Sequence, residues 1–403
     1  MIKFASRIFQ YVWIKIISLN SRIKRIMWNR QYNKISKKEK FRIVFFLSID
    51  TEWDCLLPIY RAFVSSKNSE VIIAADDFPR KSGKVASEFL AEHGYPFVKS
   101  SKYSLKKFQP HVIFITDEIS VSRNDWIFRV GARVVYVPYG TSVSAATYSQ
   151  TQQYNLPLHN SAWRIFVAGD FAKNLYGYYC DSGNDHVLSL GHPKTEVIFS
   201  RVNNNKRTNL RYTKDNPATF LWNIHFNVRG GWSTWHQYAT ALLELFESRE
   251  DVRLICRPHP FFFDSFDTKE SREAVRRLIV NNKNTCLDEA ASIADSFAKC
   301  DALITDGSSI MYDFFVTEKP MLYLRSNESF KLHKHCFDII KSYHYIGDDF
   351  SRIDRFVDLV SSGNDALRKK RSEKLYSDAE ITRPIDVGSN IREYIEKELN
   401  LLS

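Results

Sequence analysis

The sequence predicts an α/β protein made of two doubly wound, Rossmann-like lobes that follow a basic amphipathic N-terminal arm. Three observations support this prediction. Apolar runs alternate with helical patterns from residue 41, the alternation stops at a polar stretch and then restarts, and the positive charge is concentrated in the first 40 residues. Apolar strands that alternate with helices indicate parallel sheets covered on both faces. A chain of 403 residues is also long enough to bury two cores of ordinary size.

Residues 1–40 are the predicted arm. They contain eleven Lys or Arg residues and one acidic residue, whereas the rest of the chain is nearly balanced, with 46 basic and 45 acidic residues. Apolar side chains, among them Phe4, Trp13 and Ile17, recur between these charges at roughly helical spacing. We therefore expect a helix that lies on an anionic membrane surface. A basic helix packed on the body of the protein, or a disordered leader, is the alternative interpretation.

The charge pattern also limits location and partners. Lys3, Arg7 and Lys15 interrupt the apolar run of the arm before about 18 residues accumulate, so we expect neither a transmembrane span nor a signal peptide. The predicted location is cytoplasmic and peripheral, on the inner face of the plasma membrane. A nearly neutral body disfavours nucleic acid as a partner. Six scattered cysteines without a Cys-x-x-Cys spacing indicate reduced, mostly buried thiols.

Residues 41–200 form the first predicted lobe. Its expected strands are nearly uninterrupted apolar runs at residues 42–49, 111–116, 134–137 and 164–168. Amphipathic patterns between them predict helices, for example at residues 54–64 and 82–93. Residues 201–217 are rich in Asn, Lys, Arg and Thr and poor in apolar residues, which predicts a linker.

Residues 218–385 form the second predicted lobe. Its expected strands are residues 218–224, 252–256, 302–305 and 321–324, and its expected helices include residues 234–246 and 308–316. Thr234 and Gln237 have the spacing of a capping box, which predicts where the first of these helices begins. Residues 386–403 form a last helix with an apolar stripe of Ile391, Tyr394, Ile395 and Leu399. In two-lobed enzymes such a helix can cross back to the first lobe.

Polar side chains follow three of the strands expected in the second lobe. His225 follows residues 218–224, Arg257 and His259 follow residues 252–256, and the run Asp306, Gly307, Ser308 and Ser309 follows residues 302–305. Because ligands bind at the carboxyl ends of parallel strands, we expect these groups to converge in a cleft between the lobes. Arg grips phosphate with two hydrogen bonds, His can protonate a leaving oxygen, and a serine-led helix start presents free N–H groups to an anion. The pattern predicts a diphosphate pocket.

Several short motifs occur in a fixed order along the chain. The principal ones are Arg257-Pro-His259-Pro and Asp306-Gly-Ser-Ser-x-x-x-Asp313, followed by Lys319-Pro320. The supporting ones are Tyr139-Gly140-Thr141, Gly191-His192-Pro193-Lys194, Leu221-Trp222-x-x-His225, Gly231-Trp232-Ser233-Thr234 and Asp386-Val-Gly-Ser389. As an ordered set they resemble the CDP-glycerol glycerophosphotransferase family, the polymerases and primases of teichoic-acid-like polyol phosphates. The resemblance covers about residues 130–400, and residues 1–130 match in general fold alone.

The resemblance implies the GT-B architecture, with an acceptor-binding first lobe and a nucleotide-binding second lobe. A hydroxyl of a cell-surface polymer or lipid-linked acceptor would attack the phosphorus that bears glycerol or ribitol, and CMP would leave, as in capsule or teichoic-acid-like polymer synthesis. Arg257 and His259 would contact the diphosphate of this nucleotide-activated donor, and Asp306 would orient the loop or a ribose hydroxyl. The other expected substrate-binding residues are Gly307, Ser308, Ser309, Gly140, Thr141 and Asp313.

No cofactor is expected beyond the CDP-activated donor itself. Basic side chains can neutralise a diphosphate, and the sequence has no carboxylate cluster with the spacing of a Mg²⁺ site. We therefore expect transfer without a metal ion.

One position departs from the family pattern. Family polymerases have His-Gly-Thr-Pro, with the His as the expected base, where this chain has Tyr139-Gly-Thr-Ser142. A phenol, with a reference pKa near about 10, is a poor base at neutral pH. Either Tyr139 is strongly shifted, or another group such as His192, His225 or Asp50 takes the proton, or the donor and the reaction differ. The alternative function is therefore a GT-B glycosyltransferase that uses a nucleotide sugar in surface polysaccharide synthesis, and a noncatalytic membrane-bound assembly partner is a third hypothesis.

Overall fold

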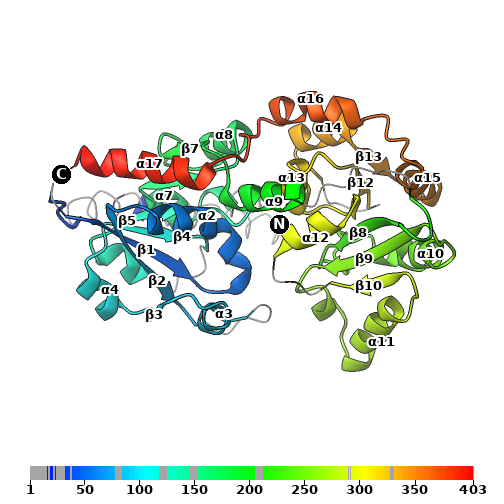
Figure 1. Ribbon diagram of the computed structural model, residues 1–403, viewed down its shortest axis with the longest axis horizontal. Coiled ribbons are helices and arrows are strands. Elements are labelled where there is room, and N and C mark those ends of the chain that lie inside the picture. Colours follow the sequence, from blue (N-terminus) through cyan, green and yellow to red (C-terminus); the bar gives the residue numbers. More distant parts are fainter. Residues whose placement is uncertain are drawn as a thin grey trace, which may run out of the picture. The chain divides into compact units, whose positions relative to one another are not determined.

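The structure is a computed structural model in which two compact units each contain one parallel sheet (Figure 1). It describes residues 32–36, 39–77, 84–117, 125–145, 153–204, 212–288, 290, 292–326 and 331–402, together with Ile16, Leu19, Asn20 and Ile23. Unit 1 consists of Met1–Thr141, Thr147–Glu196 and Glu380–Ser403, and unit 2 consists of Ser142–Ala146 and Val197–Ala379. The prediction of two α/β lobes with parallel sheets is confirmed. Most of the predicted arm lies outside the described residues.

Unit 1 contains a seven-stranded sheet in the order β3-β2-β1-β4-β5-β6-β7, in which all neighbouring strands are parallel. The strands are β1 (Phe41–Leu47), β2 (Ser69–Ala75), β3 (Val98–Lys99), β4 (Val112–Ile115), β5 (Arg133–Tyr136), β6 (Arg164–Phe166) and β7 (Val187–Leu188). The helices are η1 (Asp50–Glu52), α2 (Trp53–Val64), α3 (Ala86–Glu92), α4 (Lys102–Phe108), η2 (Asp125–Arg129), α7 (Pro157–Ser161), α8 (Asp170–Tyr179), the start of α9 (Pro193–Asn204) and α17 (Val387–Asn400). The strand order changes direction between β1 and β4, as in a doubly wound sheet.

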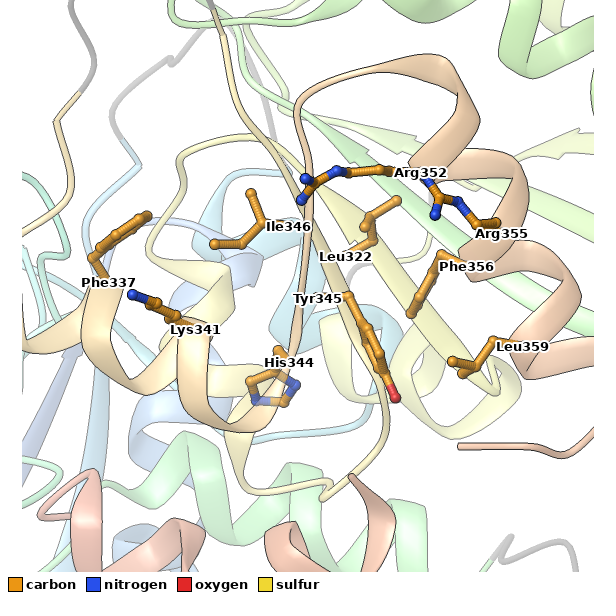
Figure 2. A pocket seen from close by; sticks show the side chains of 10 residues that line it. All are labelled: Leu322, Phe337, Lys341, His344, Tyr345, Ile346, Arg352, Arg355, Phe356 and Leu359. Atoms are coloured by element: carbon orange, nitrogen blue, oxygen red, sulfur yellow. The ribbon is translucent and has the colours of Figure 1, made fainter. Parts of the chain in front are cut away.

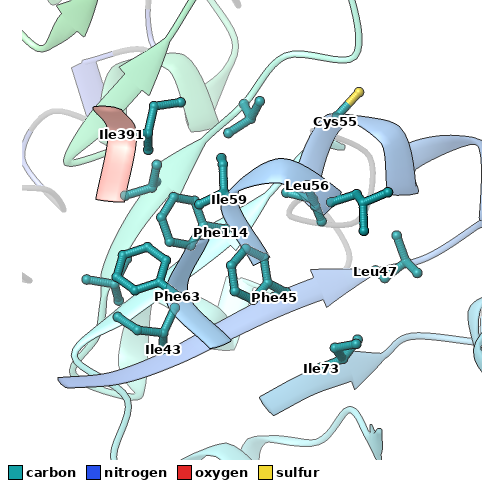
Figure 3. Packing of buried hydrophobic residues seen from close by; sticks show 14 of the residues in the cluster. Ile43, Phe45, Leu47, Cys55, Leu56, Ile59, Phe63, Ile73, Phe114 and Ile391 are labelled. Atoms are coloured by element: carbon teal, nitrogen blue, oxygen red, sulfur yellow. The ribbon is translucent and has the colours of Figure 1, made fainter. Parts of the chain in front are cut away.

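The core of unit 1 joins β1 to α2 and α17 (Figure 3). Ile43, Phe45 and Leu47 share one face of β1 because side chains alternate along a strand, and they belong to one buried cluster with α2. The stripe of α17 completes this cluster with Val387, Ile391, Ile395 and Leu399. Gly388 permits the close packing of the two helices, because a Cβ at this position would lie 2.4 Å from the carbonyl oxygen of Pro58 in α2.

Unit 2 contains a six-stranded parallel sheet in the order β10-β9-β8-β11-β12-β13. The strands are β8 (Ala218–Ile224), β9 (Val252–Pro258), β10 (Thr285–Leu287), β11 (Ala302–Thr305), β12 (Met321–Leu324) and β13 (Tyr345–Gly347). The helices are α10 (Trp235–Glu247), η3 (Phe263–Ser265), α11 (Lys269–Val280), α12 (Ile293–Lys299), α13 (Ile310–Phe315), α14 (Lys334–Tyr343), α15 (Phe350–Ser361) and α16 (Arg368–Asp378). Trp222 of β8 stacks on Trp235 of α10 in its core, with ring centroids 5.5 Å apart.

Three details differ from the sequence-based expectation. The start of the predicted linker 201–217 is helical through residue 204, and residues 205–211 lie outside the described part. Besides the short segment Ser142–Ala146, unit 2 consists of Val197–Ala379, whereas the second lobe was expected at residues 218–385 after a linker at residues 201–217. The predicted capping box of α10 does not form, because the Thr234 hydroxyl points to the buried carboxylate of Asp306 instead.

All six cysteines are free, and all except Cys286 are buried, as predicted. Among the residues that the structure describes, no helix is both long enough and apolar enough to cross a bilayer.

Candidate nucleotide-binding and active site

Three adjacent strands of unit 2 bring the predicted diphosphate-binding groups to one edge of its sheet. β9, β8 and β11 are parallel neighbours, so their carboxyl ends lie side by side. His225 follows β8, Arg257 and His259 lie at the end of β9, and Asp306 follows β11. The ring centroids of His225 and His259 are 6.3 Å apart. The strand pattern thus correctly indicated which residues meet.

Asp306 anchors this edge from inside the protein. It has no exposed surface, its Oδ1 accepts the backbone N–H of His225 at 2.7 Å, and its Oδ2 accepts the backbone N–H of Thr234 at 2.9 Å. Burial raises the pKa of this carboxyl to about 7, although the hydrogen bonds that it accepts act in the opposite direction. Asp306 therefore fixes the loop after β8 and the start of α10 to the end of β11. Because it is fully buried, it orients the loop and does not bind a ribose hydroxyl.

His225 and His259 both use Nδ1 to accept a backbone N–H group. The donors are Asn227 for His225, at 3.0 Å, and Phe261 for His259, at 3.1 Å. A nitrogen that accepts a hydrogen bond carries no proton, so each neutral ring holds its proton on Nε2. Burial lowers the pKa of both imidazoles to about 4, and both are therefore neutral at pH 7. In this state they are hydrogen-bond donors at Nε2 and not bases.

His259 is the more accessible of these two residues. It is partly exposed, and among the described residues its Nε2 has no hydrogen-bond partner. Its ring lies against Phe226 and Phe261, with centroid distances of 4.6 and 5.4 Å. His225 is 8% exposed. His259 thus presents an N–H group on a ring whose orientation is fixed by its neighbours.

Arg257 is held through one nitrogen of its guanidinium. Nη1 donates to Asp288 Oδ2 at 3.2 Å and to Ser296 Oγ at 3.3 Å, and the Ser296 hydroxyl itself donates to Asp288. Burial opposes ionisation of Asp288, but the hydrogen bond from Ser296 and the contacts with Ala290 and Arg257 lower its pKa overall. Within the described part of the chain, Nε and Nη2 of Arg257 have no partner. The side chain is therefore oriented by the ionised Asp288, while the N–H groups of Nε and Nη2 remain for an anion.

The residues after Asp306 lead into a short helix. Gly307 is buried, whereas Ser308 and Ser309 are partly exposed ahead of α13. Ser309 is the N-cap but makes no side-chain cap hydrogen bond, and Ser308 Oγ accepts the N–H of Ile310 at 3.5 Å. α13 has six residues, fewer than the predicted 308–316, so an anion here would rely on hydroxyl and N–H groups more than on a helix dipole. Asp313 is 5% exposed inside α13, and its predicted contact with a substrate stays a prediction.

In unit 1, Tyr139 follows β5 and is held by a buried lysine. Tyr139 is 50% exposed, Gly140 is partly buried and Thr141 is 6% exposed. Lys194, in the first turn of α9, is 4% exposed and donates from Nζ to the carbonyl oxygen of Tyr139 at 2.5 Å. The same Nζ lies 4.5 Å from the centroid of the Tyr139 ring, a cation–π contact. Lys194 thus fixes both the backbone and the ring of Tyr139.

His192, expected as an alternative base, is buried and held by hydrogen bonds at both ring nitrogens. It is 2% exposed, its Nε2 donates to the carbonyl oxygen of Pro138 at 2.5 Å, and its Nδ1 accepts the N–H of Lys194 at 3.2 Å. Burial lowers its pKa to about 3. With both nitrogens engaged, His192 ties the start of α9 to the segment before Tyr139. Asp50, the other alternative base, is 9% exposed and accepts the N–H of Thr51 at 2.7 Å.

Three residues of these two sites have no role in the sequence-based prediction. Lys194 belongs to the motif Gly191-His192-Pro193-Lys194, but the sequence analysis gives it no role. A lysine directly after a Gly-His-Pro turn could have been recognised as a candidate site residue. Asp288 and Ser296 come from the end of β10 and from α12. They reach Arg257 through tertiary contacts alone, so no local pattern could have identified them.

The part of the chain that the structure describes contains no group of three or more His, Cys, Asp or Glu residues able to hold a metal ion. The basic and hydroxyl groups at this edge of the unit 2 sheet are compatible with a diphosphate alone and with a diphosphate bound to a cation. Transfer without a metal ion therefore stays a prediction.

The two parallel doubly wound units define a GT-B-like enzyme fold, and the edge formed by Arg257 and His259 is typical of a site for an anionic nucleotide. Residues 139–335 match the family model described as CDP-Glycerol:Poly(glycerophosphate) glycerophosphotransferase. The segment contains every predicted catalytic and substrate-binding residue. The protein is therefore a glycerophosphotransferase-like enzyme, and the predicted family resemblance is confirmed.

Solved structures share the fold at low sequence identity. The wall teichoic acid polymerase TagF is 13% identical, with a TM-score of 0.57 over 100% of this chain and 99% of that one. The S. aureus MnaA–UDP co-structure is 14% identical, with a TM-score of 0.61 over 90% and 97%. The Neisseria meningitidis UDP-GlcNAc 2-epimerase bound to UDP-GlcNAc is 13% identical, with a TM-score of 0.57 over 89% and 100%. At such identities the likeness establishes the fold alone. No curated protein gives a significant match.

Proposed function

We propose that this enzyme transfers glycerol phosphate or ribitol phosphate from a CDP-activated donor to a hydroxyl of a polymer or lipid-linked acceptor, in the synthesis of a teichoic-acid-like or capsular surface polymer. The observation that carries the proposal is the meeting of Arg257, His259 and the Ser308–Ser309 loop at one sheet edge, inside the segment that matches the glycerophosphotransferase family. The acceptor hydroxyl attacks the phosphorus that bears the polyol. The bond between this phosphorus and the oxygen of CMP breaks, and the hydroxyl proton is released.

The donor diphosphate is held by groups whose protonation states suit hydrogen-bond donation. Arg257 supplies a permanent charge and two nitrogens, Nε and Nη2, without a partner among the described residues, and His259 supplies Nε2–H. Negative charge grows on the leaving oxygen as the bond to CMP breaks, so donors that are already oriented stabilise the transition state more than the ground state. The negative charge of a bound diphosphate also favours protonation of His259, which raises the pKa of this residue from its value of about 4 in the free protein.

Tyr139 orients the acceptor hydroxyl in unit 1 and is not a strong general base. Phosphoryl transfer through a loose transition state depends mainly on positioning and charge stabilisation, so the reaction has little need of a strong base. Lys194 holds the Tyr139 ring in place through the cation–π contact. This role accommodates the one departure from the family motif, because a phenol can position a hydroxyl group as well as an imidazole can.

The nucleotide specificity of the donor is tested directly by thermal stabilisation and product analysis. CDP-glycerol or CDP-ribitol is expected to raise the melting temperature and to release CMP in the presence of an acceptor, whereas UDP-GlcNAc is expected to do neither. A nucleotide-sugar transferase is the second candidate, because two of the fold relatives carry UDP or UDP-GlcNAc. Stabilisation by UDP or GDP nucleotides without any response to CDP would reject polyol-phosphate transfer in favour of that candidate.

The basic N-terminal arm is proposed to hold the enzyme on the inner face of the plasma membrane. The last part of the arm is tied to unit 1 by Asn33, whose N–H donates to the carbonyl oxygen of Gly131 at 2.7 Å and whose Nδ2 donates to that of Pro110 at 2.8 Å. Tyr32 adds a ring contact, 4.4 Å from the guanidinium of Arg133. These contacts place the root of the arm at the amino ends of β4 and β5, whereas Tyr139 follows the carboxyl end of β5.

Deletion of residues 1–31 tests this role and leaves the anchor at Tyr32 and Asn33 intact. The truncated protein is expected to lose binding to vesicles that contain anionic lipid while keeping its melting temperature and its CDP affinity. Equal binding of the full-length and truncated proteins to these vesicles would reject the proposed role of the arm.

A further inference from the structure

Unit 2 contains a cavity of about 520 Å³ that shares no residue with the candidate nucleotide site (Figure 2). It lies at β13, the last strand of the sheet, where α14 and α15 flank that strand. Figure 2 shows Phe337 and Lys341 of α14 on one side of the cavity and Arg352 and Arg355 of α15 on the other. Its volume is in the range of small-molecule sites, roughly 300–1,000 Å³.

The lining combines an apolar wall with a cationic rim. The wall includes Leu322, Ile346, Phe356 and Leu359, the rim consists of Lys341, Arg352 and Arg355, and none of the ten lining residues is acidic. An apolar surface with a few charged side chains is typical of a binding site for an amphiphile. The apolar wall removes the aliphatic chain of the ligand from water, and the cationic rim binds its charged group.

The cations of the rim keep donors available for a ligand. Arg352 pairs with Asp348 through Nε alone, at 3.0 Å, and with Asp349 through the same atom at 3.8 Å. Arg355 uses Nε and Nη2 to bind Ser351. Among the residues described, both Nη groups of Arg352, Nη1 of Arg355 and Nζ of Lys341 have no hydrogen-bond partner. Asp348 and Asp349 therefore orient Arg352 but leave N–H groups of the rim for a ligand.

A buried histidine in the lining provides an independent sign of a missing partner. His344 is 3% exposed, and neither of its ring nitrogens has a hydrogen-bond partner among the described residues. One face of its ring stacks on Phe315, with centroids 5.1 Å apart. Burial, with a smaller contribution from Arg371, lowers its pKa well below the usual value, so the ring is neutral with one donor and one acceptor. Buried polar groups rarely stay unsatisfied in folded proteins, and each exception needs a partner such as water or a ligand.

We propose that this cavity binds a lipid phosphate, with its aliphatic chain against the apolar wall and its phosphate at Arg352 and Arg355. Inorganic phosphate leaves the apolar wall exposed to water, and a neutral alcohol leaves the cations unused. The basic N-terminal arm is also a poor occupant, because its eleven Lys and Arg residues would be repelled by the rim. The site is separate from the proposed transfer reaction and does not depend on it.

Octyl phosphate below its critical micelle concentration is a suitable probe, with octanol and inorganic phosphate as the comparison ligands. Binding to the full-length protein is measured by isothermal titration calorimetry and by the methyl resonance of Ile346, assigned with the Ile346→Leu variant. Octyl phosphate is expected to shift this resonance and to bind at least tenfold more tightly than either comparison ligand. The Arg352→Ala/Arg355→Ala double variant is expected to weaken this binding at least tenfold.

The matched control is Arg368→Ala/Lys369→Ala, which removes the same two charges from exposed positions of α16. The control protein is expected to bind octyl phosphate as the wild type does, and melting temperatures within about 2 °C of the wild type establish that both double variants are folded. Equal affinity of the wild type and the Arg352→Ala/Arg355→Ala variant would overturn the proposal. So would equal affinity for octyl phosphate and inorganic phosphate, or an Ile346 resonance that does not move at saturation.

Discussion

Asp306→Asn removes the charge of the residue that joins three segments of the candidate nucleotide site while keeping its size. The pKa of Asp306 is raised from 3.8 to about 7 in the folded protein because the carboxyl is buried. Between these two values the folded state binds more protons than the unfolded state. The contribution of Asp306 to stability is therefore fully present below pH 3.8 and is lost as the pH rises to about 7. Asn has no such dependence.

The size of this effect follows from the shift. About three pKa units correspond to about 4 kcal/mol over the whole titration, at about 1.36 kcal/mol per unit. Roughly 2–3 kcal/mol of this change falls between pH 5 and pH 8, because ionisation of the unfolded chain begins well below pH 5. The free energy of unfolding of Asp306→Asn, relative to that of the wild type, is thus expected to rise by about 2–3 kcal/mol from pH 5 to pH 8. His225 and His259 titrate in both proteins and cancel in this difference.

Urea unfolding at four pH values between 5 and 8 measures the difference. Near-ultraviolet circular dichroism is a suitable signal because the stacked pair of Trp222 and Trp235 lies in the core of unit 2. Asp215→Asn is the control, because it removes a carboxylate from an exposed position of the same unit. A difference for Asp306→Asn that does not change with pH would refute the raised pKa and the buried anchoring role.

Four further substitutions test individual assignments. Arg257→Lys keeps the charge but loses the planar fork, and calorimetry is expected to show CDP affinity about tenfold weaker; unchanged affinity would contradict a diphosphate contact. Tyr139→Phe is expected to lower kcat by less than about 100-fold at an unchanged donor KM, and a loss above about 1,000-fold would identify a general base instead. His192→Gln is expected to destabilise the fold by roughly 1–3 kcal/mol without changing the pH–rate profile, and a lost limb of that profile would restore His192 as a catalytic residue. Gly388→Ala forces a Cβ against the backbone of Pro58 and is expected to cost about 1–3 kcal/mol in calorimetric unfolding, whereas the neighbouring Ser389→Ala is expected to have little effect.

The sequence predicts the second sheet well because its strands are short, apolar and fully buried. Residues 218–224 and 302–305 coincide with β8 and β11, and the polar residues that follow them meet at one edge because the strands are neighbours. The helix after β11 was predicted too long, since Ser308 and Ser309 have the composition of a helix start but lie ahead of Ile310. When two serines are adjacent, composition does not reveal where the helix that follows them begins.

Roles within the site were harder to predict, because burial and hydrogen-bond partners decide them. His192 and His259 occur in similar local contexts, each next to proline. In the structure, both nitrogens of His192 bind the protein, whereas His259 keeps Nε2 without a partner in the described part of the chain. Asp306 resembles a ligand-binding carboxylate in sequence but is fully buried. Tertiary packing separates these cases, and no local pattern contains that information.

Calorimetric titration of CDP-glycerol into three proteins tests most directly whether Arg257 and His259 form the diphosphate site. The proteins are the wild type, His259→Ala and His236→Ala, the last of which removes an exposed histidine from α10 of the same unit. Loss of one hydrogen bond to a charged phosphate, worth about 1.5–3 kcal/mol, is expected to weaken binding roughly 10- to 100-fold in His259→Ala. His236→Ala is expected to match the wild type. Equal affinities in all three proteins, or tighter binding of UDP than of CDP, would contradict this site.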